Sequence, residues 1–299
     1  MTIRVLIIGC GDVGSECGRQ LLNDQNQDKD RTQDVEIIGV RRNAAKLPEA
    51  FTRISADFTD AESFISIIKQ QAADFVIYSA AASQHDEAGY RSAYVDGLNN
   101  TLSAIAHWPQ PPKHIFFTSS TGVYHQADHG WVDETSATEP TRFSGAIMLE
   151  AEQLLANSGL PSSAVRFSGI YGPGRNRLIN AVKAGKGAPA EPLSYSNRIH
   201  RDDCAGVLAH LIQLTLLGKA LDSCYLASDC EPAPLADVTD WLAQQLNTEL
   251  TDFSMGRMAG SKRCDNRRLL ESGYQFKYPH FRSGYASLLK ECSANKNES

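Results

Sequence analysis

The chain has 299 residues, and 42% of them are hydrophobic, which is enough to bury one large core or two unequal lobes. Its formal net charge of −6 gives no general positive field that would attract nucleic acid or an anionic membrane, so the composition favours a small-molecule partner. The seven cysteines are scattered without a CxxC pair, so we expect reduced thiols, no disulfide framework and no metal site.

Short and almost wholly apolar runs recur along the first half of the chain, as expected of strands buried on both faces. They begin at Arg4, Val35, Phe75, His114 and Ser163. Patterns of helical period lie between them, over residues 13–23, 61–71, 90–105 and 145–157. This alternation predicts an α/β fold, in which a doubly wound parallel sheet of the Rossmann type is covered by helices on both faces.

A glycine-rich turn follows the first predicted strand directly. In GCGDVG the glycines Gly9, Gly11 and Gly14 form GxGxxG at the point where the strand should turn into a helix. Such a turn allows a pyrophosphate to approach the backbone and to sit at the helix N-terminus, where Asp12 and Val13 lie. We therefore expect a dinucleotide at this loop. The other ligand weighed is S-adenosylmethionine, whose enzymes usually lack a third glycine in this register.

The residues that end the second strand predict which dinucleotide is bound. An NAD site normally has a carboxylate here to accept hydrogen bonds from the ribose 2′-hydroxyl, whereas this chain has Arg41 and Arg42. A guanidinium can bind a 2′-phosphate, so the pair predicts NADP(H) over NAD(H), unless both arginines are merely solvated. Further along, Asp57 is placed to meet the adenine amino group, although Asp57 or Thr59 could instead cap the next helix.

These motifs occur in a familiar order. The glycine loop, Asp57, YSAAAS at Tyr78 and FFTSSTGVY at Phe116 together resemble the extended short-chain dehydrogenase/reductases, the NAD(P)-dependent epimerase/dehydratase family. The resemblance covers most of the chain, and the segment 261–285 is similar to the atypical YeeZ-like branch. It implies that Ala80 and Ala81 also contact the cofactor.

The family's catalytic residues match only in part. Ser120, four residues before Tyr124, matches the hydroxyl that polarises the substrate oxygen. The YxxxK pair should follow, but aligning on LEAEQ at 149–153 puts Ser144 and Met148 in its two positions. Methionine supplies no charge, and an aliphatic hydroxyl is a far weaker acid than a phenol. We therefore expect the helix from Gly145 to serve mainly for packing.

Other groups could supply the missing proton. The resemblance directs Tyr124, Tyr171, His125 and His200 toward the cleft, and Tyr124 and His200 are the candidates, since His200 titrates in the useful range. A structural role for each of them is the alternative. Arg175 and Arg198 are candidates for holding an anionic part of a substrate.

The less regular pattern after Ser168 predicts a smaller C-terminal lobe. We expect an NADP-binding domain over 1–167 with 197–227, a substrate-side lobe over 168–196 and 228–290, and a disordered tail over 291–299. The apolar run at 5–8 is too short for a signal peptide and no later run could span a membrane, so a cytoplasmic location is expected. The resemblance also implies a possible homodimer through the helices at Tyr90 and Gly145.

Two functions remain open at this point. The first is an atypical NADP-dependent oxidoreductase or epimerase that acts on a small carbonyl, alcohol or sugar-like metabolite. The second is an NADP(H)-binding sensor or regulatory protein without turnover, which Ser144 and Met148 favour.

Overall fold

The computed structural model describes residues 2–27, 34–256 and 261–297. The chain forms two compact units. The first comprises residues 1–123, 138–166 and 204–225, and the second comprises 124–137, 167–203 and 226–299. The second unit therefore takes in 124–137 and 197–203, which the sequence-based boundaries placed in the cofactor domain.

The first unit is built on a parallel sheet of seven strands in the order β11-β7-β5-β4-β1-β2-β3. Its central strands are buried on both faces, which explains their continuous apolar runs. The strands are β1 (Ile3–Ile8), β2 (Val35–Arg41), β3 (Thr52–Ser55), β4 (Phe75–Tyr78), β5 (His114–Ser120), β7 (Ser162–Phe167) and β11 (Cys224–Ala227). Strand β1 lies between β2 and β4, so the order of the strands reverses there.

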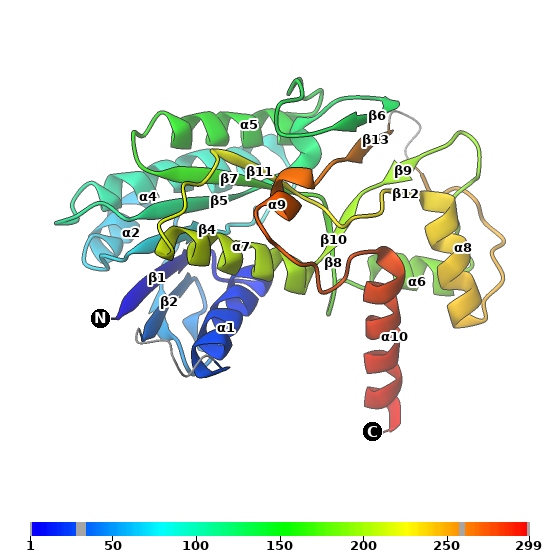
Figure 1. The fold of residues 1–299 in the computed structure, drawn as a ribbon, viewed down its shortest axis with the longest axis horizontal. Helices are drawn as coiled ribbons and strands as arrows, with labels where there is room; N and C mark the ends of the chain where they lie inside the picture. Colours follow the sequence, from blue (N-terminus) through cyan, green and yellow to red (C-terminus); the bar gives the residue numbers. More distant parts are fainter. Residues whose placement is uncertain (1, 28–33, 257–260, 298–299) are drawn as a thin grey trace. The chain divides into compact units, whose positions relative to one another are not determined.

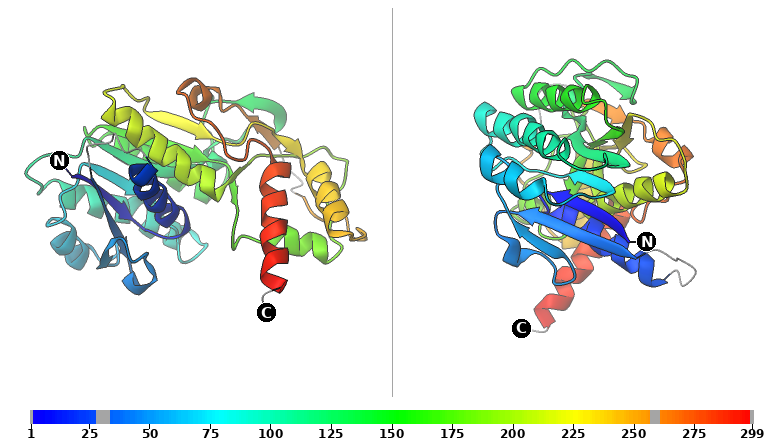
Figure 2. Two further views of the ribbon diagram at one scale, coloured as in Figure 1. Left: turned by 60° about the horizontal axis from the view of Figure 1, so that its bottom comes forward. Right: turned by 90° about the vertical axis from the view of Figure 1, so that its left-hand side faces the viewer.

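Helices cover both faces of this sheet, as Figures 1 and 2 show. On one face lie α1 (Asp12–Gln27) and α7 (Arg201–Leu216). On the other lie α2 (Ala61–Ile68), α4 (Gly97–Ile105) and α5 (Phe143–Ala156). Short 3₁₀ turns, η1 (Ala44–Lys46) and η3 (Thr121–Val123), follow β2 and β5. The doubly wound α/β fold predicted from the sequence is confirmed.

The helix expected over 90–105 is divided into three parts. It runs as α3 (Glu87–Arg91), a π-helical turn η2 (Ser92–Asp96) and α4. Within the π turn, the carbonyl of Ala93 accepts a hydrogen bond of 2.5 Å from the Tyr78 hydroxyl at the end of β4. A side chain that inserts into a helical hydrogen-bond ladder widens the turn, which is a physical reason for the π geometry.

In its described residues, the second unit combines short two-stranded sheets with four helices. Its strands are β6 (Asp128–Val132), β8 (Gly169–Tyr171), β9 (Tyr195–Ser196), β10 (Arg198–His200), β12 (Ala233–Pro234) and β13 (Ser261–Cys264). Its helices are α6 (Arg177–Lys183), α8 (Leu235–Leu246), α9 (Arg267–Glu271) and α10 (Phe281–Asn297). The pairing of β6 with β13 and of β8 with β10 explains why 124–137 and 197–203 belong here. The core of this unit gathers around Phe281, Val238 and Leu242.

The tail differs from the sequence-based expectation. Helix α10 continues to Asn297, so residues 291–297 are helical where a disordered tail was expected, and 298–299 lie outside the described residues. The segment contains neither glycine nor proline, so it lacks the residues that stop a helix most strongly. Within the described residues, every helix is too short or too polar to span a bilayer.

A buried ion pair ties three elements of the first unit together. Arg166 on β7 contacts Glu152 on α5 at 2.6 Å, and each side chain is less than a tenth exposed. Glu152 also accepts a hydrogen bond from the Ser119 hydroxyl on β5. Two residues earlier on the same helix, Glu150 pairs with Arg91 at 2.7 Å, but there both side chains are 45% exposed.

These two glutamates provide a matched test of stability. Glu152→Ala should lower the free energy of unfolding by about 3–5 kcal/mol, because it leaves the Arg166 charge buried without its partner. Glu150→Ala, which breaks the exposed pair, should change it only slightly, because water replaces the lost contact. Urea denaturation of both variants measures the difference, and equal losses would contradict this role for the buried pair.

Candidate functional site

The loop after β1 and the loop after β4 meet at the point where the strand order reverses. Gly9 has a φ of +70°, and a Cβ atom built on it would lie 2.6 Å from the Cα of Ala80. The Ser79 N–H donates to the carbonyl of Ile8 at 2.8 Å, which joins the two loops further. Only glycine fits both the conformation and the close approach. In doubly wound sheets this crevice is where ligands bind.

The other two glycines of the loop have different surroundings. A Cβ on Gly14 would lie 2.8 Å from Cγ2 of Ile7, so this glycine allows α1 to pack closely on β1. A Cβ on Gly11 would meet nothing nearer than 3.7 Å, so its backbone is open to a ligand. Helix α1 begins at exposed Asp12, followed by buried Val13. The N-terminus of α1 therefore offers the backbone N–H groups and positive dipole that a pyrophosphate needs.

A cavity of about 330 Å³ lies in the first unit beside the loop that follows β4. It is lined by residues that follow β2, β3 and β4 and by the first turns after the β4 loop: Arg42, Asp57, Phe58, Thr59, Ala81, Ser83, Gln84, Ala88, Gly89, Ser92 and Ala93. A guanidinium, a carboxylate and an aromatic ring therefore share one cavity. This combination suits an adenosine that carries a phosphate, because each chemical part of it finds a complementary group.

Asp57 and the arginines take distinct places around this cavity. Oδ1 of Asp57 accepts hydrogen bonds from the N–H and the hydroxyl of Thr59. The cap of α2 is Asp60, whose side chain accepts from the Ser63 N–H, so the alternative cap by Asp57 or Thr59 is wrong. Within the described part of the chain, neither Arg41 nor Arg42 has a side-chain hydrogen bond or ion pair. Only Arg42 lines the cavity.

Arg41 lies nearer the glycine loop. Burial is the largest influence on the thiol of Cys10, between Gly9 and Gly11, and raises its pKa to about 11. The positive charge of Arg41 acts in the opposite direction and lowers that pKa. Arg41 follows Val40, whose carbonyl accepts a hydrogen bond of 2.9 Å from the Cys10 N–H, so it adjoins the loop, while Arg42 lines the cavity.

Ser120 and the start of α5 lie close together. The Ser120 hydroxyl oxygen accepts a hydrogen bond of 3.0 Å from the Gly122 N–H. A Cβ on Gly145 would clash with the carbonyl of Gly122, so the first turn of α5 packs directly against η3. Ser144 is half-buried at this junction, and Met148 is buried in the core with 5% of its surface exposed. The α5 side chains here bring no acid or base to Ser120.

An aromatic group that the sequence analysis missed lies beside this junction. The ring of Phe143 packs edge-on against Tyr90, with centroids 5.5 Å apart, and Tyr90 lies 5.3 Å from Tyr94. Two tyrosines four residues apart in a predicted helix were the available signal, because that spacing places them on one face. The structure thus brings Tyr90 against the first residue of α5, near the position where a tyrosine was expected, and Tyr94 against Tyr90.

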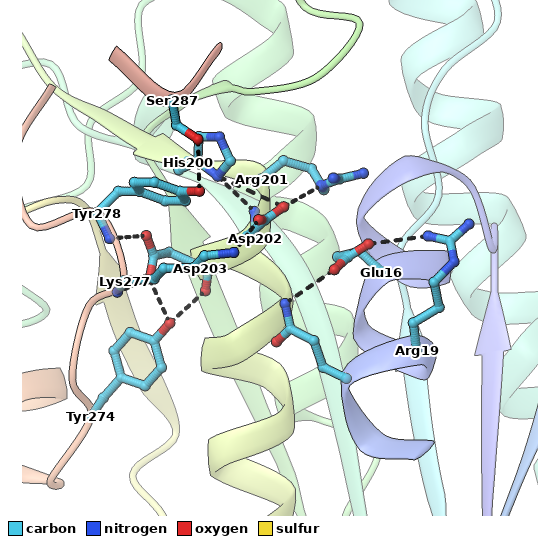
Figure 3. Close-up of polar contacts among 11 residues, drawn as sticks. Glu16, Arg19, His200, Arg201, Asp202, Asp203, Tyr274, Lys277, Tyr278 and Ser287 are labelled. Carbon is cyan, nitrogen blue, oxygen red and sulfur yellow. Dashed lines mark hydrogen bonds and ion pairs between the residues drawn. The ribbon is translucent and has the colours of Figure 1, made fainter. Parts of the chain in front are cut away.

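The remaining catalytic candidates, Tyr124 and His200, lie in the second unit, and contacts within that unit fix their side chains. The hydroxyl of Tyr124 donates to the carbonyl of Asp133 at 2.7 Å. His200 is 1% exposed, and its ring lies between those of Tyr171 and Tyr278. Its Nδ1 accepts the Asp202 N–H at 3.1 Å, as Figure 3 shows. Both side chains therefore help to fix the local structure.

The two candidate substrate arginines differ in exposure. Arg175 is exposed in the turn before α6. Arg198 is 5% exposed, donates to the Ser196 hydroxyl at 2.6 Å and lies 5.7 Å from the centre of the Phe281 ring. The sequence could not show this burial, because it depends on α10, more than eighty residues later. Arg198 thus belongs to the interior of its unit.

Asp229 is fully buried near Arg198. Burial raises its pKa to about 8, and the Arg198 charge opposes the shift. Oδ1 accepts the Glu231 N–H at 3.3 Å, while Oδ2 has no hydrogen-bond partner among the described residues. A carboxyl in such surroundings keeps its proton at neutral pH.

Comparisons with known proteins identify related folds. Residues 9–214 match a family model described as NAD(P)H-binding. A solved structure from Methylobacillus flagellatus, classed as an NAD-dependent epimerase/dehydratase, is 36% identical over 97% of this chain and 99% of that chain, with a TM-score of 0.79. A human epimerase family protein solved with NADPH is 19% identical over 94% of this chain and 97% of that chain, with a TM-score of 0.72. The 3-diazoavenalumate denitrifying reductase of a Streptomyces species is 24% identical over 71% of this chain and 73% of its own length.

The buried carboxyl makes stability depend on pH. Asp229 keeps its proton in the folded state up to a pH of about 8, whereas in the unfolded chain it releases it near 3.8. Between these values the folded state binds more protons, so the free energy of unfolding should fall as the pH rises from 5 to 8. Asp229→Asn should remove this part of the slope, whereas Asp240→Asn, at an exposed position of α8, should keep it. Urea denaturation at several pH values measures both slopes, and an unchanged slope in Asp229→Asn would show that another group titrates.

Proposed function

The chain belongs to the NAD(P)H-binding family, and from this premise we propose that it binds NADP(H) in its first unit and acts as an oxidoreductase on a small metabolite. When bound, the cofactor supplies or accepts the hydride. The observation that carries the proposal is the cavity that Arg42 and Asp57 line together with Ala81, in the loop whose Ala80 approaches Gly9.

Charge and shape in this cavity support NADP(H) over NAD(H). An arginine at the end of β2 cannot accept hydrogen bonds from a ribose hydroxyl, but its fork matches a phosphate. Because Arg42 has no ion pair within the described part of the chain, it can bind a 2′-phosphate without breaking one. Oδ2 of Asp57 remains available to an adenine amino group, since Thr59 engages only Oδ1.

The chemistry proposed for the reacting end rests on Ser120. Its hydroxyl lies at the end of β5, beside the first turn of α5, and would orient a carbonyl or alcohol oxygen. Ser144 and Met148 supply neither a phenol nor an ammonium, so a reaction that needs little acid–base assistance is favoured. We therefore favour a reductase over an epimerase. The reductase activity in the name of the Streptomyces relative agrees with this choice.

The substrate is proposed as a small carbonyl, alcohol or sugar-like metabolite, with exposed Arg175 as a contact for an anionic group. Because Arg198 is buried, its proposed role is indirect: it would help to hold β10, the strand on which it lies, in place. A cytoplasmic location and a homodimer remain parts of the same proposal.

The second candidate function is a sensor that binds NADP(H) without turnover. It is favoured by one observation, the burial of Met148 at the position where a catalytic lysine is expected. A search for turnover separates the two functions: NADPH absorbance is followed while the protein is mixed with fractionated cytosolic metabolites. Oxidation confined to one fraction supports the enzyme, and its absence in every fraction, with NADPH still bound, supports the sensor.

The cofactor preference is tested by removing the cation of the cavity. Arg42→Ala should weaken NADPH binding roughly 10- to 100-fold, because a charged hydrogen bond contributes about 1.5–3 kcal/mol. NADH binding should stay the same, since NADH has no 2′-phosphate. Arg53→Ala, on neighbouring β3, is the matched control and should change neither affinity. Calorimetric titration measures all three proteins, and equal affinity of the unmodified protein for NADH and NADPH would refute the preference.

The role of Ser120 is tested by separating turnover from binding. Ser120→Ala should lower any NADPH oxidation by about 10²-fold, because the substrate oxygen loses a positioned hydrogen-bond donor. The affinity for NADPH should not change, since the cavity lies elsewhere in the unit. Full activity in this variant would remove Ser120 from the proposed chemistry.

A further inference from the structure

Tyr94 owes its position to a contact made by another tyrosine. The Tyr78 hydroxyl donates to the Ala93 carbonyl, and the π turn η2 spans this point. A Cβ on Gly97 would also clash with the Tyr78 hydroxyl, so glycine is required for this close packing. Tyr94 is the next residue after Ala93. It is therefore fixed relative to β4 by a buried hydrogen bond, and π turns of this kind recur at functional sites.

The Tyr94 hydroxyl meets the loop that follows β4. Burial raises the pKa of Tyr94, and a backbone hydrogen bond from Ala82 lowers it. A backbone group that favours the phenolate is an N–H donor, so this influence places the Ala82 N–H near the phenol oxygen. Ala82 directly follows Ala81, which lines the cavity, and Ala81 follows Ala80, which approaches Gly9. The phenol oxygen thus lies at the loop proposed to hold the cofactor.

The same phenol is connected to the reacting end of the site. The Tyr94 ring packs on Tyr90, and Tyr90 packs on Phe143, the first residue of α5. The next residues of α5, Ser144 and Gly145, adjoin the turn of Gly122 that binds the Ser120 hydroxyl. In addition, Arg91 and Glu150 form a two-pronged ion pair that ties α3 to α5. One aromatic row therefore runs from the β4 loop to the start of α5.

We propose that Tyr94 is the acid–base residue of this site and supplies the proton that no side chain at the start of α5 can supply. The inference rests on the proposed function. During reduction the O–H bond of Tyr94 breaks and an O–H bond forms at the substrate oxygen, while the carbon of that carbonyl gains the hydride. The carbonyl becomes an alcohol, and water returns a proton to the phenolate. Oxidation of the alcohol follows these steps in reverse.

The other buried phenols are less suited to this role. Tyr78 already donates its proton to Ala93. Tyr124 donates to Asp133, in the second unit. For Tyr94, the Ala82 backbone instead lowers the pKa and so favours the phenolate that a proton donor leaves behind.

The test places a reporter at Tyr94 itself. Tyr94 is replaced by 3,5-difluorotyrosine, whose more acidic phenol ionises near neutral pH, and a matched protein carries the same replacement at Tyr90. Fluorine NMR follows the ionisation of each phenol with no ligand, with saturating NADP⁺, and with 2′-phospho-ADP-ribose, which lacks the nicotinamide. Calorimetry establishes the binding of each ligand beforehand.

We expect NADP⁺ to lower the pKa of the reporter at position 94 by about one unit or more, because a positive charge within a few ångströms favours the phenolate. The reporter at Tyr90 should shift much less, and 2′-phospho-ADP-ribose should shift neither. If NADP⁺ binds without lowering the pKa at position 94, or if 2′-phospho-ADP-ribose lowers it equally, the role of Tyr94 is refuted while the proposed cofactor site stands. If NADP⁺ does not bind at all, both proposals fail.

Discussion

The close approach of Gly9 to Ala80 is the constraint on which the first unit depends. At 2.6 Å from the Ala80 Cα, a Cβ at position 9 would push apart the loops that follow β1 and β4. With glycine there, the two loops close the crevice where the strand order reverses, and the N-terminus of α1 opens toward it. The open backbone of Gly11 belongs to the first of these loops, and the cavity beside Arg42 is lined by Ala81 of the second.

A second constraint acts on the helical segments that follow the β4 loop in the chain. The Tyr78 hydroxyl takes the Ala93 carbonyl out of a regular helical ladder, and the π turn that results sets the direction of Tyr94. Through Tyr90 and Phe143 this turn is joined to α5. The start of α5, which carries no acid or base, is thus packed beside a phenol from another element. The chemistry of the site can therefore be distributed differently while the fold stays the same.

The sequence predicted those elements of the fold that depend on a local residue pattern. The buried strands and the helix after GxGxxG could be read directly, because burial on both faces and a glycine turn leave clear signals. The π turn could not be predicted, since it arises when Tyr78 reaches Ala93, fifteen residues away. Segment 124–137 was assigned to the other lobe because its partner strand, β13, lies more than 120 residues later. The burial of Arg198 likewise depends on Phe281, which no local pattern indicates.

The central claim is that NADP(H) binds where the loops after β1 and β4 meet. Hydrogen–deuterium exchange of the full chain, with and without NADPH, tests it most directly. Bound cofactor should slow exchange at the backbone amides of Gly11–Val13 and at those of 81–83, because these N–H groups become hydrogen-bonded or shielded from water. NADPH that binds while exchange in both segments stays unchanged would contradict the account.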